Sequence, residues 1–560
     1  MKLASLKEGQ FVETGGYYTK GDVGQAKYLI VAAQAVDGYA DHTLANGTVA
    51  VLQINSGRFL VSQFGARNGV DSTLQVQAAA NATPTDGKFV FDVVGECLFT
   101  SVTFDNKTDI EIVGSSGCYI NGEIYIHNFS GVKTKDLNIK QSGKVVSGRH
   151  GISLANGVNY TSQSDTFQGC DSCVYVEPVD LFQHVRRVTI HDTKTSPVDS
   201  DLYTSAEIND FPSIYYSDRF PNYLLYCDHT APSNPEVFQT GDFSVLSCNP
   251  VLVSVSHIHA LGLDGLICSG NTFFMPSYYY RSQRKKHNIY LNKTTWVIID
   301  SNDLFEAGLQ SIKIERGANI TIGNNEIAWS GQRDFTQGDG VLLSLDPNDT
   351  FSNFKVTGTS IRLPSGSGVK LSGACNYATI SSVNCIIPGS SNVYYGDGTN
   401  PAGPTALPAI TGTYYGVDVP QECSQVTVGD VSCTGTHSLP KSISTFNSTQ
   451  SRKNGPHMSN VGCNNGKFEK TNVATLTDIS TGSIDVSNYA FITVNDVSGG
   501  SVTDLLNGNN GEEVAIYNTS TGFTIVNDST KIRCYGQANI LVRFRDTVKF
   551  RLLSDIWYQV

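Results

Sequence analysis

The apolar residues of this 560-residue chain fall in short runs of three or four, separated by Gly, Asn, Asp or Ser. Residues 251–253, 296–299 and 341–343 are examples. Such runs favour short buried β-strands, whereas an amphipathic helix needs apolar residues every three or four positions over a longer stretch. The pattern therefore predicts an all-β protein.

One helix is predicted, over residues 72–81. It starts with Ser72-Thr73-Leu74-Gln75, which has the spacing of a capping box, and continues with apolar residues on one side. Pro84 follows and would prevent its continuation.

The strand-like runs repeat along the chain. Residues 299–305 can be laid over residues 322–328 with a shift of 322 − 299 = 23, so that Asp303 falls on Glu326. Residues 356–361 and 380–385 continue the pattern 24 apart, and residues 428–433 follow after 48, which we interpret as two such steps. A period in the low twenties is typical of one coil of a parallel β-solenoid, since each coil buries its apolar face only by stacking on its neighbours. The Leu pattern and helical segment of leucine-rich repeats are missing.

The same overlay places Asn302 and Asn325 at one corner of successive coils. There their side-chain amides can form a ladder, and Asn also tolerates a left-handed backbone.

Three stretches interrupt the repeat. Residues 196–240 are too long for a coil corner and predict a large inserted loop, and long loops in such scaffolds are often functional. Residues 389–408 are rich in Gly, Ser, Asn and Pro and predict a turn-rich excursion. Residues 434–455 predict a linker, after which alternating strands with Gly- and Asn-rich turns predict a separate C-terminal β domain.

Composition excludes several classes of function. The formal net charge is −12, which argues against a general binder of nucleic acid or anionic membranes because negative charge repels phosphate. No apolar run approaches the length of a membrane-spanning helix, and the first residues lack the apolar core of a signal peptide.

Cysteine and histidine give no metal pattern. The 13 Cys are scattered apart from Cys170 and Cys173, and without a second pair we interpret them as structural thiols. His257 and His259 alternate, so both should point to one face of a strand, and with no carboxylate close by they are interpreted as structural. No nucleophile elbow or phosphate loop is present, so acyl-transfer and nucleotide chemistry have no motif. No metal or other cofactor is expected.

Both ends of the chain resemble parts of bacteriophage tailspike proteins. Residues 14–30 and 42–47 resemble the segment that precedes the β-helix in these proteins. Residues 61–67, with the helix from Ser72, resemble the start of the pectate-lyase-like right-handed parallel β-helix, although Asn68-Gly69-Val70-Asp71-Ser72-Thr73 replaces the usual Asp-Gly-x-x-Asp-Asp. Residues 511–514 and 556–560 are similar in style to C-terminal β domains of phage tail proteins.

The resemblance implies a right-handed parallel β-helix over residues 58–455, a connecting segment over 1–57 and a C-terminal antiparallel β domain over 470–560. It implies a homotrimer on the virion tail, made in the host cytoplasm, that binds a bacterial capsule or O-antigen polysaccharide and cleaves it. Only about 55 residues precede the helix start, too few for the head-binding domain of full tailspikes, so attachment through the N-terminus to another tail or baseplate protein is expected. Neither nucleic acid nor membrane insertion is implied.

Paired carboxylates are the chemistry that hydrolysis of a glycosidic bond requires, one as acid and one as base or nucleophile. The overlay brings Asp303 and Glu326 to the same position of adjacent coils, about 4.8 Å apart in the strand-to-strand direction. Glu306 and Asp334 lie just beyond the two strands, so four acids are candidates for catalysis. The alternative is that each is a solvated corner residue.

Aromatic and basic residues near these acids are candidates for sugar binding. Trp329 can stack on a sugar ring or pack between coils, and Arg333 can pair with a sugar carboxylate or with Asp334. The stretch 276–287 interleaves aromatic and basic residues and is interpreted as a site for an anionic glycan, or as a solvated loop. Its candidates are Tyr280, Arg281 and Arg284.

Two other functions stay open. A polysaccharide lyase on the same fold would depend more on Tyr280, Arg281, Arg284 and Lys285 than on the acids. A non-cleaving receptor-binding spike would use the acids only to bind sugar. The sequence also leaves open whether the site lies within one subunit or between two, and Glu207 in the 196–240 loop is a further candidate.

Overall fold

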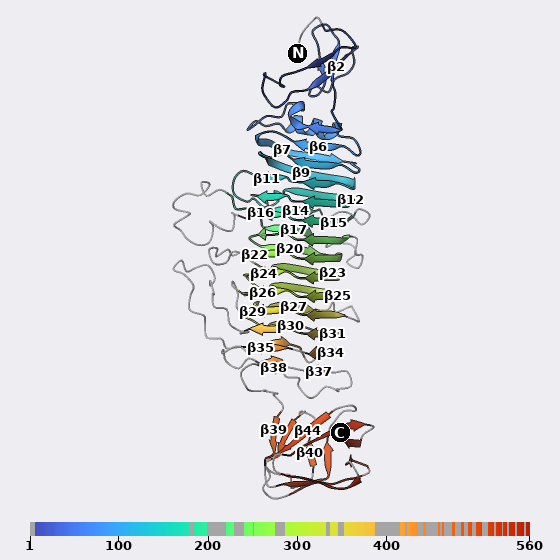
Figure 1. The fold of residues 1–560 in the computed structure, drawn as a ribbon, viewed down its shortest axis with the longest axis vertical. Helices are drawn as coiled ribbons and strands as arrows, with labels where there is room; N and C mark the ends of the chain where they lie inside the picture. The colour runs from blue at the N-terminus through green and yellow to red at the C-terminus, as the bar shows by residue number, and fades with distance from the viewer. Residues whose placement is uncertain are drawn as a thin grey trace, which may run out of the picture.

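The computed structural model shows an elongated molecule with three successive parts (Figure 1). It describes residues 6–177, 184–198, 220–228, 240–249, 251–274, 286–331, 337–344, 352–373, 375–386 and 415–420, and from 423 to the C-terminus shorter stretches that hold mainly the strands. A small sheet lies at the N-terminal end, a long stack of coils follows, and a separate group of strands forms the C-terminal end.

The N-terminal part is a four-stranded antiparallel sheet in the order β1-β2-β4-β3. Its strands are β1 (Phe11–Glu13), β2 (Lys27–Val31), β3 (His42–Thr43) and β4 (Val49–Leu52). Tyr28 and Ile30 alternate with more exposed neighbours and are buried in the same hydrophobic core as the coils. The sheet therefore packs on the coil stack.

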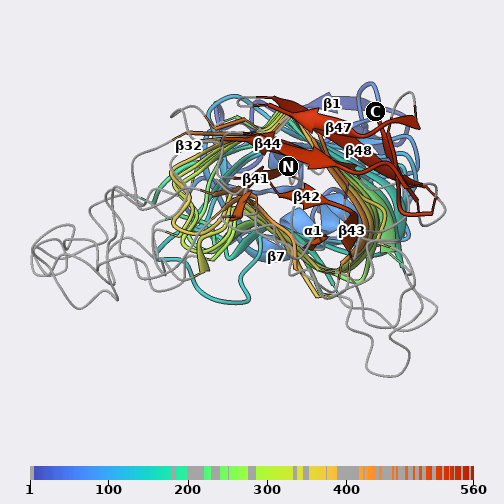
Figure 2. The same ribbon diagram turned by 90° about the horizontal axis from the view of Figure 1, so that it is seen from below.

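The predicted helix is confirmed as α1 (Thr73–Ala82). Its buried residues Val76, Ala79 and Ala80 face the first coils, so the helix covers the N-terminal end of the stack (Figure 2). The predicted capping box is wrong, because the Ser72 hydroxyl donates to the carbonyl oxygen of Val70 instead of capping the helix.

The coils form a parallel β-helix, as predicted, with two sheets whose strands pair in parallel. In the described residues the long sheet has 26 strands and the second sheet has eight. The long sheet consists of β5 (Arg58–Leu60), β6 (Lys88–Phe91), β7 (Gly95–Asp105), β8 (Glu111–Gly114), β9 (Cys118–Ser130), β10 (Lys133–Lys135), β11 (Asn138–Lys140), β12 (Ile152–Gln163), β13 (Thr166–Gln168), β14 (Ser172–Val176), β15 (Val185–His191), β16 (Lys194–Thr195), β17 (Tyr223–Asp228), β18 (Thr240–Leu246), β20 (Ser256–Leu261), β21 (Leu263–Ser269), β23 (Ile289–Asp300), β25 (Ile312–Gly323), β27 (Val341–Ser344), β28 (Phe354–Thr357), β30 (Val369–Ser372), β31 (Asn376–Ser381), β33 (Tyr415–Asp418), β34 (Ser424–Gly429), β36 (Lys441–Ile443) and β37 (His457–Ser459). The eight-stranded sheet consists of β19 (Val251–Leu252), β22 (Thr272–Phe274), β24 (Asp303–Phe305), β26 (Glu326–Ala328), β29 (Ser360–Arg362), β32 (Asn384–Ile386), β35 (Ser432–Thr434) and β38 (Gly462–Cys463).

The core runs along the inside of the stack. Alternate residues of each strand point inward, so Ile299, Ile322 and Val356 lie above one another in successive coils and are fully or almost fully buried. Viewed along the long axis, the coils superimpose (Figure 2). A coil with one apolar face is therefore stabilised by its two neighbours, as the repeat predicts.

The predicted register is confirmed for the central coils and wrong for one step. Ile299 pairs with Ile322, a shift of 23, and Val356 pairs with Ile380, a shift of 24. Ile380, however, pairs directly with Val428, so the 48-residue step is one coil and not two. The extra length leaves the stack between β32 and β33, where the predicted 389–408 excursion lies outside the described residues.

Two predicted interruptions contain strands of the stack. Residues 223–228, inside the predicted 196–240 loop, form β17, which pairs with β14 and β20. Residues 441–443, inside the predicted 434–455 linker, form β36, which pairs with β33. These parts of the loop and linker predictions are wrong, because short apolar runs in them complete coils. Residues 199–219 and 229–239 lie outside the described residues.

The predicted Asn ladder is confirmed, with a different backbone. The Asn302 side chain donates to Asn325 Oδ1 (3.0 Å), and the Asn271 side chain donates to Asn302 Oδ1 (2.8 Å), which extends the ladder by a coil. Asn302 and Asn325 are not the left-handed residues, since the positive φ angles belong to the residues before them, Ser301 (55°) and Asn324 (49°). The ladder Asn side chains point into the stack and satisfy buried backbone groups.

His257 and His259 do not share a surface, contrary to the prediction. His257 is fully buried, stacks on Phe273 and bonds through Nε2 to the carbonyl oxygen of Val251, so its structural role is confirmed. His259 lies on the outside of the long sheet. The described cysteine side chains are buried and free of disulfides, Cys170 and Cys173 included.

A buried carboxyl group in the coils is expected to make stability depend on pH. Asp165 is completely buried and accepts hydrogen bonds from Thr134 Oγ1 (2.6 Å), Ser162 Oγ (2.7 Å) and the backbone N–H of Leu137 (2.9 Å). Burial raises the pKa of Asp165 from 3.8 to about 6, although these hydrogen bonds oppose the rise.

Between about pH 4 and pH 6 the folded chain therefore keeps a proton on Asp165 that the unfolded chain has lost. The contribution of this group to stability is complete below pH 4 and is lost as the pH rises through 6. Between pH 4 and pH 7 the wild type should lose roughly 3 kcal/mol more stability than Asp165→Asn, at about 1.4 kcal/mol per pKa unit. Unfolding curves at a series of pH values measure this, and parallel pH profiles of the two proteins would contradict it.

The C-terminal part has its own hydrophobic core, which includes Ile492, Ile516, Phe550 and Trp557. Its strands are β39 (Val473–Leu476), β40 (Ser483–Asp485), β41 (Phe491–Val494), β42 (Ser501–Val502), β43 (Asp504–Leu506), β44 (Glu513–Asn518), β45 (Phe523–Ile525), β46 (Ile532–Arg533), β47 (Ile540–Val542), β48 (Thr547–Leu553) and β49 (Ile556–Gln559). Antiparallel pairing, as predicted, joins β44–β48, β48–β49 and β45–β47. Parallel pairing, which the sequence pattern did not predict, joins β39–β41–β44, β40–β43, β42–β45 and β46–β49.

Candidate functional site

The predicted acidic pair lies on the outside of the eight-stranded sheet. Asp303 on β24 is the register partner of Glu326 on β26. Leu304 and Ile327, the next residue of each strand, are fully buried, so both acids point away from the core. The two carboxyl groups therefore start from adjacent strands, about 4.8 Å apart.

Arg362 on the next strand, β29, joins this pair. Its Nη2 lies 3.7 Å from Glu326 Oε1, and both side chains are about half exposed. The guanidinium offsets part of the repulsion between the two carboxylates. The sequence analysis missed Arg362, although extending the overlay by one more coil would have placed it beside the pair.

Glu306 and Trp329 occupy the same corner, immediately after β24 and β26. Both have left-handed backbones, with φ angles of 57° and 59°, which are unusual for such large side chains. Successive backbone bonds hold the corner, because the Glu306 N–H donates to the Ala328 carbonyl and the Trp329 N–H to the Arg362 carbonyl. The Trp329 ring also contacts Phe305, at 6.2 Å between centroids.

The structure thus brings together Asp303, Glu326, Glu306 and Trp329. The other predicted site residues lie outside the described residues: Asp334, Arg333, Tyr280, Arg281 and Arg284, as well as Lys285 and Glu207. Within the described residues, no group of three or more His, Cys, Asp or Glu side chains is arranged to hold a metal ion. The described α-helix, with ten residues, is too short to cross a membrane.

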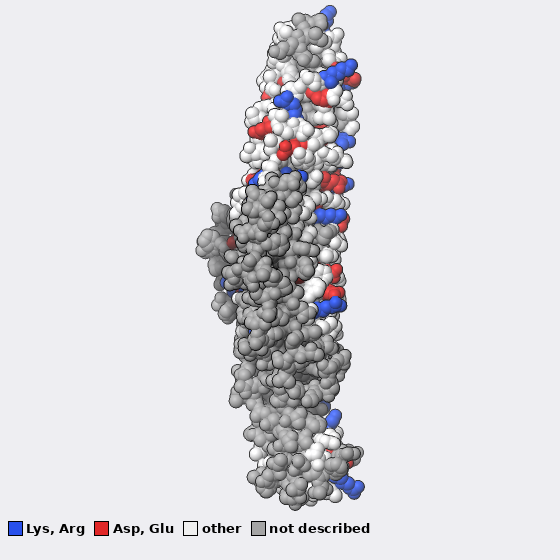
Figure 3. Space-filling view, turned by 90° about the vertical axis from the view of Figure 1, so that its left-hand side faces the viewer, with Lys and Arg blue, Asp and Glu red and all other residues white. Residues whose placement is uncertain are grey.

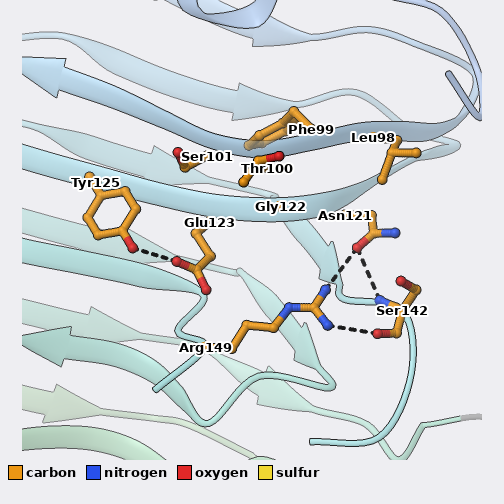
Figure 4. Close-up of a pocket in the computed structure, with 10 residues that line it drawn as sticks. All are labelled: Leu98, Phe99, Thr100, Ser101, Asn121, Gly122, Glu123, Tyr125, Ser142 and Arg149. Carbon is orange, nitrogen blue, oxygen red and sulfur yellow. Dashed lines mark hydrogen bonds between the residues drawn. The ribbon is translucent and has the colours of Figure 1, made fainter. Parts of the chain in front are cut away.

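A pocket that the sequence analysis did not predict lies on the long sheet near its N-terminal end (Figure 4). It has a volume of about 410 Å³ and is lined by Leu98, Phe99, Thr100, Ser101, Asn121, Gly122, Glu123, Tyr125, Ser142 and Arg149. Most of these residues come from β7 and β9, and Ser142 and Arg149 come from the connection that leads to β12.

Three polar side chains define the chemistry of this pocket. The Tyr125 hydroxyl donates to Glu123 Oε2 (2.5 Å), and Arg149 donates to the Ser142 carbonyl (2.8 Å) and to Asn121 Oδ1 (3.1 Å) (Figure 4). Burial, followed by the bond to Glu123, raises the pKa of Tyr125, so its hydroxyl stays protonated. Burial lowers the pKa of Arg149, and Glu123 opposes that shift.

The pocket therefore combines a guanidinium, a carboxylate and a phenol. Such a set can hold a sugar carboxylate or hydroxyl groups and can move a proton. The alternation of Glu123 and Tyr125 around Ile124 was a signal that both share one face of a strand, whereas nothing in the sequence placed Arg149 beside them.

Charged side chains of both signs are mixed over the described part of the face seen in Figure 3. This distribution agrees with the negative net charge and gives the described part of that face no extended cationic surface.

No protein-family model and no curated protein matches this chain. The solved structures that are similar to it are mainly phage tailspike proteins. The enzymatically active domain of tailspike protein 2 from bacteriophage CBA120 is 12% identical, with a TM-score of 0.33 over 98% of this chain and 68% of that one. The gp42 tailspike of Acinetobacter phage vb_AbaP_AS12 is 12% identical, with a TM-score of 0.38 over 99% and 89%.

An enzyme has the same type of likeness. The A-module of the mannuronan C-5 epimerase AlgE4 from Azotobacter vinelandii is 13% identical, with a TM-score of 0.34 over 72% of this chain and 100% of that one. At these identities the likeness concerns the winding of the chain, and we derive its function from its own residues.

Proposed function

We propose that this protein is a phage tailspike depolymerase that hydrolyses glycosidic bonds of a bacterial surface polysaccharide. The observation that carries the proposal is the in-register pair Asp303 and Glu326 on the outside of the eight-stranded sheet, with Trp329 at the same corner. The resemblance of residues 14–30 and 61–67 to tailspike segments agrees with it.

In this proposal Asp303 is the acid and Glu326 the nucleophile. Asp303 gives its proton to the glycosidic oxygen, the bond from this oxygen to the anomeric carbon breaks, and the Glu326 carboxylate bonds to that carbon. Water then replaces Glu326 and gives its proton to Asp303. A pair of strands about 4.8 Å apart suits the short carboxyl separation of retaining glycosidases. Arg362 supports the assignment of Glu326, because it is the ion-pair partner of that carboxylate. Glu306 and Asp334 are the next candidates for the acid, and Trp329 and Arg333, with Tyr280, Arg281 and Arg284, are the proposed sugar-binding residues.

Product analysis tests this function. The purified chain is incubated with capsule and lipopolysaccharide preparations, and the expected product is a shorter polymer with a new reducing end. An unsaturated end that absorbs ultraviolet light would mean elimination, and an intact polymer that still binds would mean adhesion only; both contradict hydrolysis.

Elimination is the second candidate, and the pocket at Arg149 favours it. There Arg149 would hold the carboxylate of a uronic acid, Glu123 would remove the proton beside that carboxylate, and the protonated Tyr125 would donate to the leaving oxygen. This route predicts that Arg149, and not Asp303, is required for cleavage.

We also propose that the chain forms a homotrimer and joins the virion tail through another tail protein at its N-terminus. Self-association is supported by apolar side chains that stay exposed on the long sheet. Trp296 is 66% exposed, Ile267 44% and Ile298 43%, and the three border a hollow of about 550 Å³.

A further inference from the structure

A row of aromatic rings runs along the outside of the long sheet. Tyr175 on β14, Tyr226 on β17, His259 on β20 and Tyr290 on β23 are register partners in turn, one in each successive coil. His150 stacks on Tyr175 at the N-terminal end of the row. We call these five residues the ring ladder. Its strands follow one another down the stack in Figure 1.

The rings of the ladder stack on one another. Neighbouring centroids lie 3.9 Å (His150–Tyr175), 5.8 Å (Tyr175–Tyr226), 5.0 Å (Tyr226–His259) and 4.9 Å (His259–Tyr290) apart. Because parallel strands are about 4.8 Å apart, rings at the same register cover each other's faces. The ladder therefore presents its polar edges, the tyrosine hydroxyls and imidazole nitrogens, and not its ring faces.

Some of these polar groups have no partner among the described residues. The Tyr290 hydroxyl donates to Glu315 Oε2 (2.7 Å), but no hydrogen bond of this kind involves the hydroxyls of Tyr175 and Tyr226 in the described part of the chain. His259 Nδ1 is buried and likewise has no hydrogen-bond partner there. The ladder thus has unused hydrogen-bonding groups over its Tyr175–His259 part.

Two carboxylates lie beside this part of the ladder. Glu177 and Asp228 follow Tyr175 and Tyr226 by two positions, and the pairing of Val176 with Cys227 places them in adjacent coils. Glu177 Oε1 lies 3.4 Å from Nε2 of His127, which belongs to β9.

The electrostatics of the ladder agree with this placement. Burial and then Asp228 raise the pKa of Tyr226 to about 12, so its hydroxyl remains a donor. Burial and the nearby Lys286 lower the pKa of His259 to about 4, against the effect of Asp228, so this ring is neutral at pH 7. The ladder itself is therefore uncharged, and the charge beside its upper part is negative.

We propose that the ring ladder, with Glu177 and Asp228 beside it, is a binding strip for uncharged, hydroxyl-rich sugar residues of a polysaccharide that lies along the stack. Carboxylates accept hydrogen bonds from sugar hydroxyls and repel sugar carboxylates, and tyrosine hydroxyls and neutral imidazoles can both donate and accept. The strip uses side chains from several coils, which suits a repeating polymer.

The strip points toward the pocket at Arg149. Tyr175 pairs in register with Ser153, and Ser153 pairs with Tyr125, which lines that pocket. The pocket is thus one coil beyond the Tyr175 end of the row. The inference rests on the proposed function only in taking a polysaccharide as the ligand, since the acid pair at Asp303 and Glu326 belongs to the other sheet.

Substituting two hydroxyl groups tests the strip. Full-length wild type and the Tyr175→Phe/Tyr226→Phe variant are compared on arrays of immobilised neutral and acidic bacterial capsule and lipopolysaccharide preparations. Both rings and their stacking stay, so the folded stability should not change. Two lost hydrogen bonds of about 0.5–1.5 kcal/mol each should weaken binding of neutral polymers about tenfold. Tyr558→Phe in the C-terminal part is the matched control and should bind as the wild type does.

Equal binding by wild type and the double variant would show that the ladder is a structural stack only and would overturn the proposal. Wild type that binds no neutral polymer would overturn it as well. Glu177→Gln should also weaken binding, and tighter binding by that variant would contradict the sugar class.

The same arrays separate this inference from the proposed function. Asp303→Asn/Glu326→Gln should bind like wild type and leave the polymer intact. Polymers that wild type binds through the strip but never shortens would contradict depolymerase activity and leave the strip standing. Polymers that both wild type and the tyrosine double variant bind and cleave equally would reject the strip alone.

Discussion

Asp303→Asn and Glu326→Gln are each expected to lower the rate of polysaccharide cleavage about 100-fold to 10 000-fold, the range that a general acid or base contributes. Each amide keeps the size of the side chain but can neither give nor take the catalytic proton. Because both side chains point away from the buried core, folding should be unaffected. The release of reducing ends from a cleaved polysaccharide, measured at saturating substrate, gives the rate.

The control lies on the same coil. Asp300→Asn removes a carboxylate three positions before Asp303, in a residue that bonds to the Ser301 hydroxyl and the Asn324 amide, and it should retain the wild-type rate. Glu306→Gln and Asp334→Asn complete the set. If all four acids can be replaced by amides without loss of rate, the catalytic site is elsewhere, and the pocket at Arg149 becomes the first alternative.

Asn302→Ala is expected to lower the free energy of unfolding by about 3–5 kcal/mol. Asn302 Oδ1 accepts hydrogen bonds from the backbone N–H (3.1 Å) and side-chain amide (2.8 Å) of Asn271. Its own amide donates to the carbonyl of Cys268 (2.9 Å) and to Asn325 Oδ1 (3.0 Å). The substitution leaves several buried groups without partners, each at a cost of about 1–3 kcal/mol.

Denaturant unfolding of the purified protein measures this loss. Asn384→Ala, at an exposed position of β32 on the eight-stranded sheet, is the control and should stay within about 0.5 kcal/mol of the wild type. If Asn302→Ala is no less stable than the control, the Asn ladder contributes little to the stack.

The central coils could be predicted because sequence spacing and spatial contact coincide there. Between Ile299 and Ile322 the chain makes one turn without an excursion, so the shift of 23 residues is also the register of the strands. Wherever a coil carries extra residues this link fails. Ile380 and Val428 are neighbours in space, yet their spacing of 48 suggested a missing coil.

The ring ladder was hidden for the same reason. Tyr175 and Tyr226 are direct register partners but are 226 − 175 = 51 residues apart, and the stretch between them was interpreted as containing a loop. His259 was considered together with His257 because the two alternate, whereas a bend at the start of β20 turns His257 into the core and leaves His259 on the surface. Arg149 and Arg362 approach carboxylates on other coils, which spacing alone does not reveal.

The sequence by itself determined that the chain is a stack of short strands with an inward apolar face, and it placed Asp303 beside Glu326. It did so because a solenoid repeats one local pattern, and each residue meets the one a coil later. Only the tertiary structure decided which distant surface residues share a row, since excursions of unequal length change the sequence distance between neighbours without changing the strand spacing. The ring ladder, the pocket at Arg149 and the ion pair of Arg362 with Glu326 therefore became visible only once the coils were stacked.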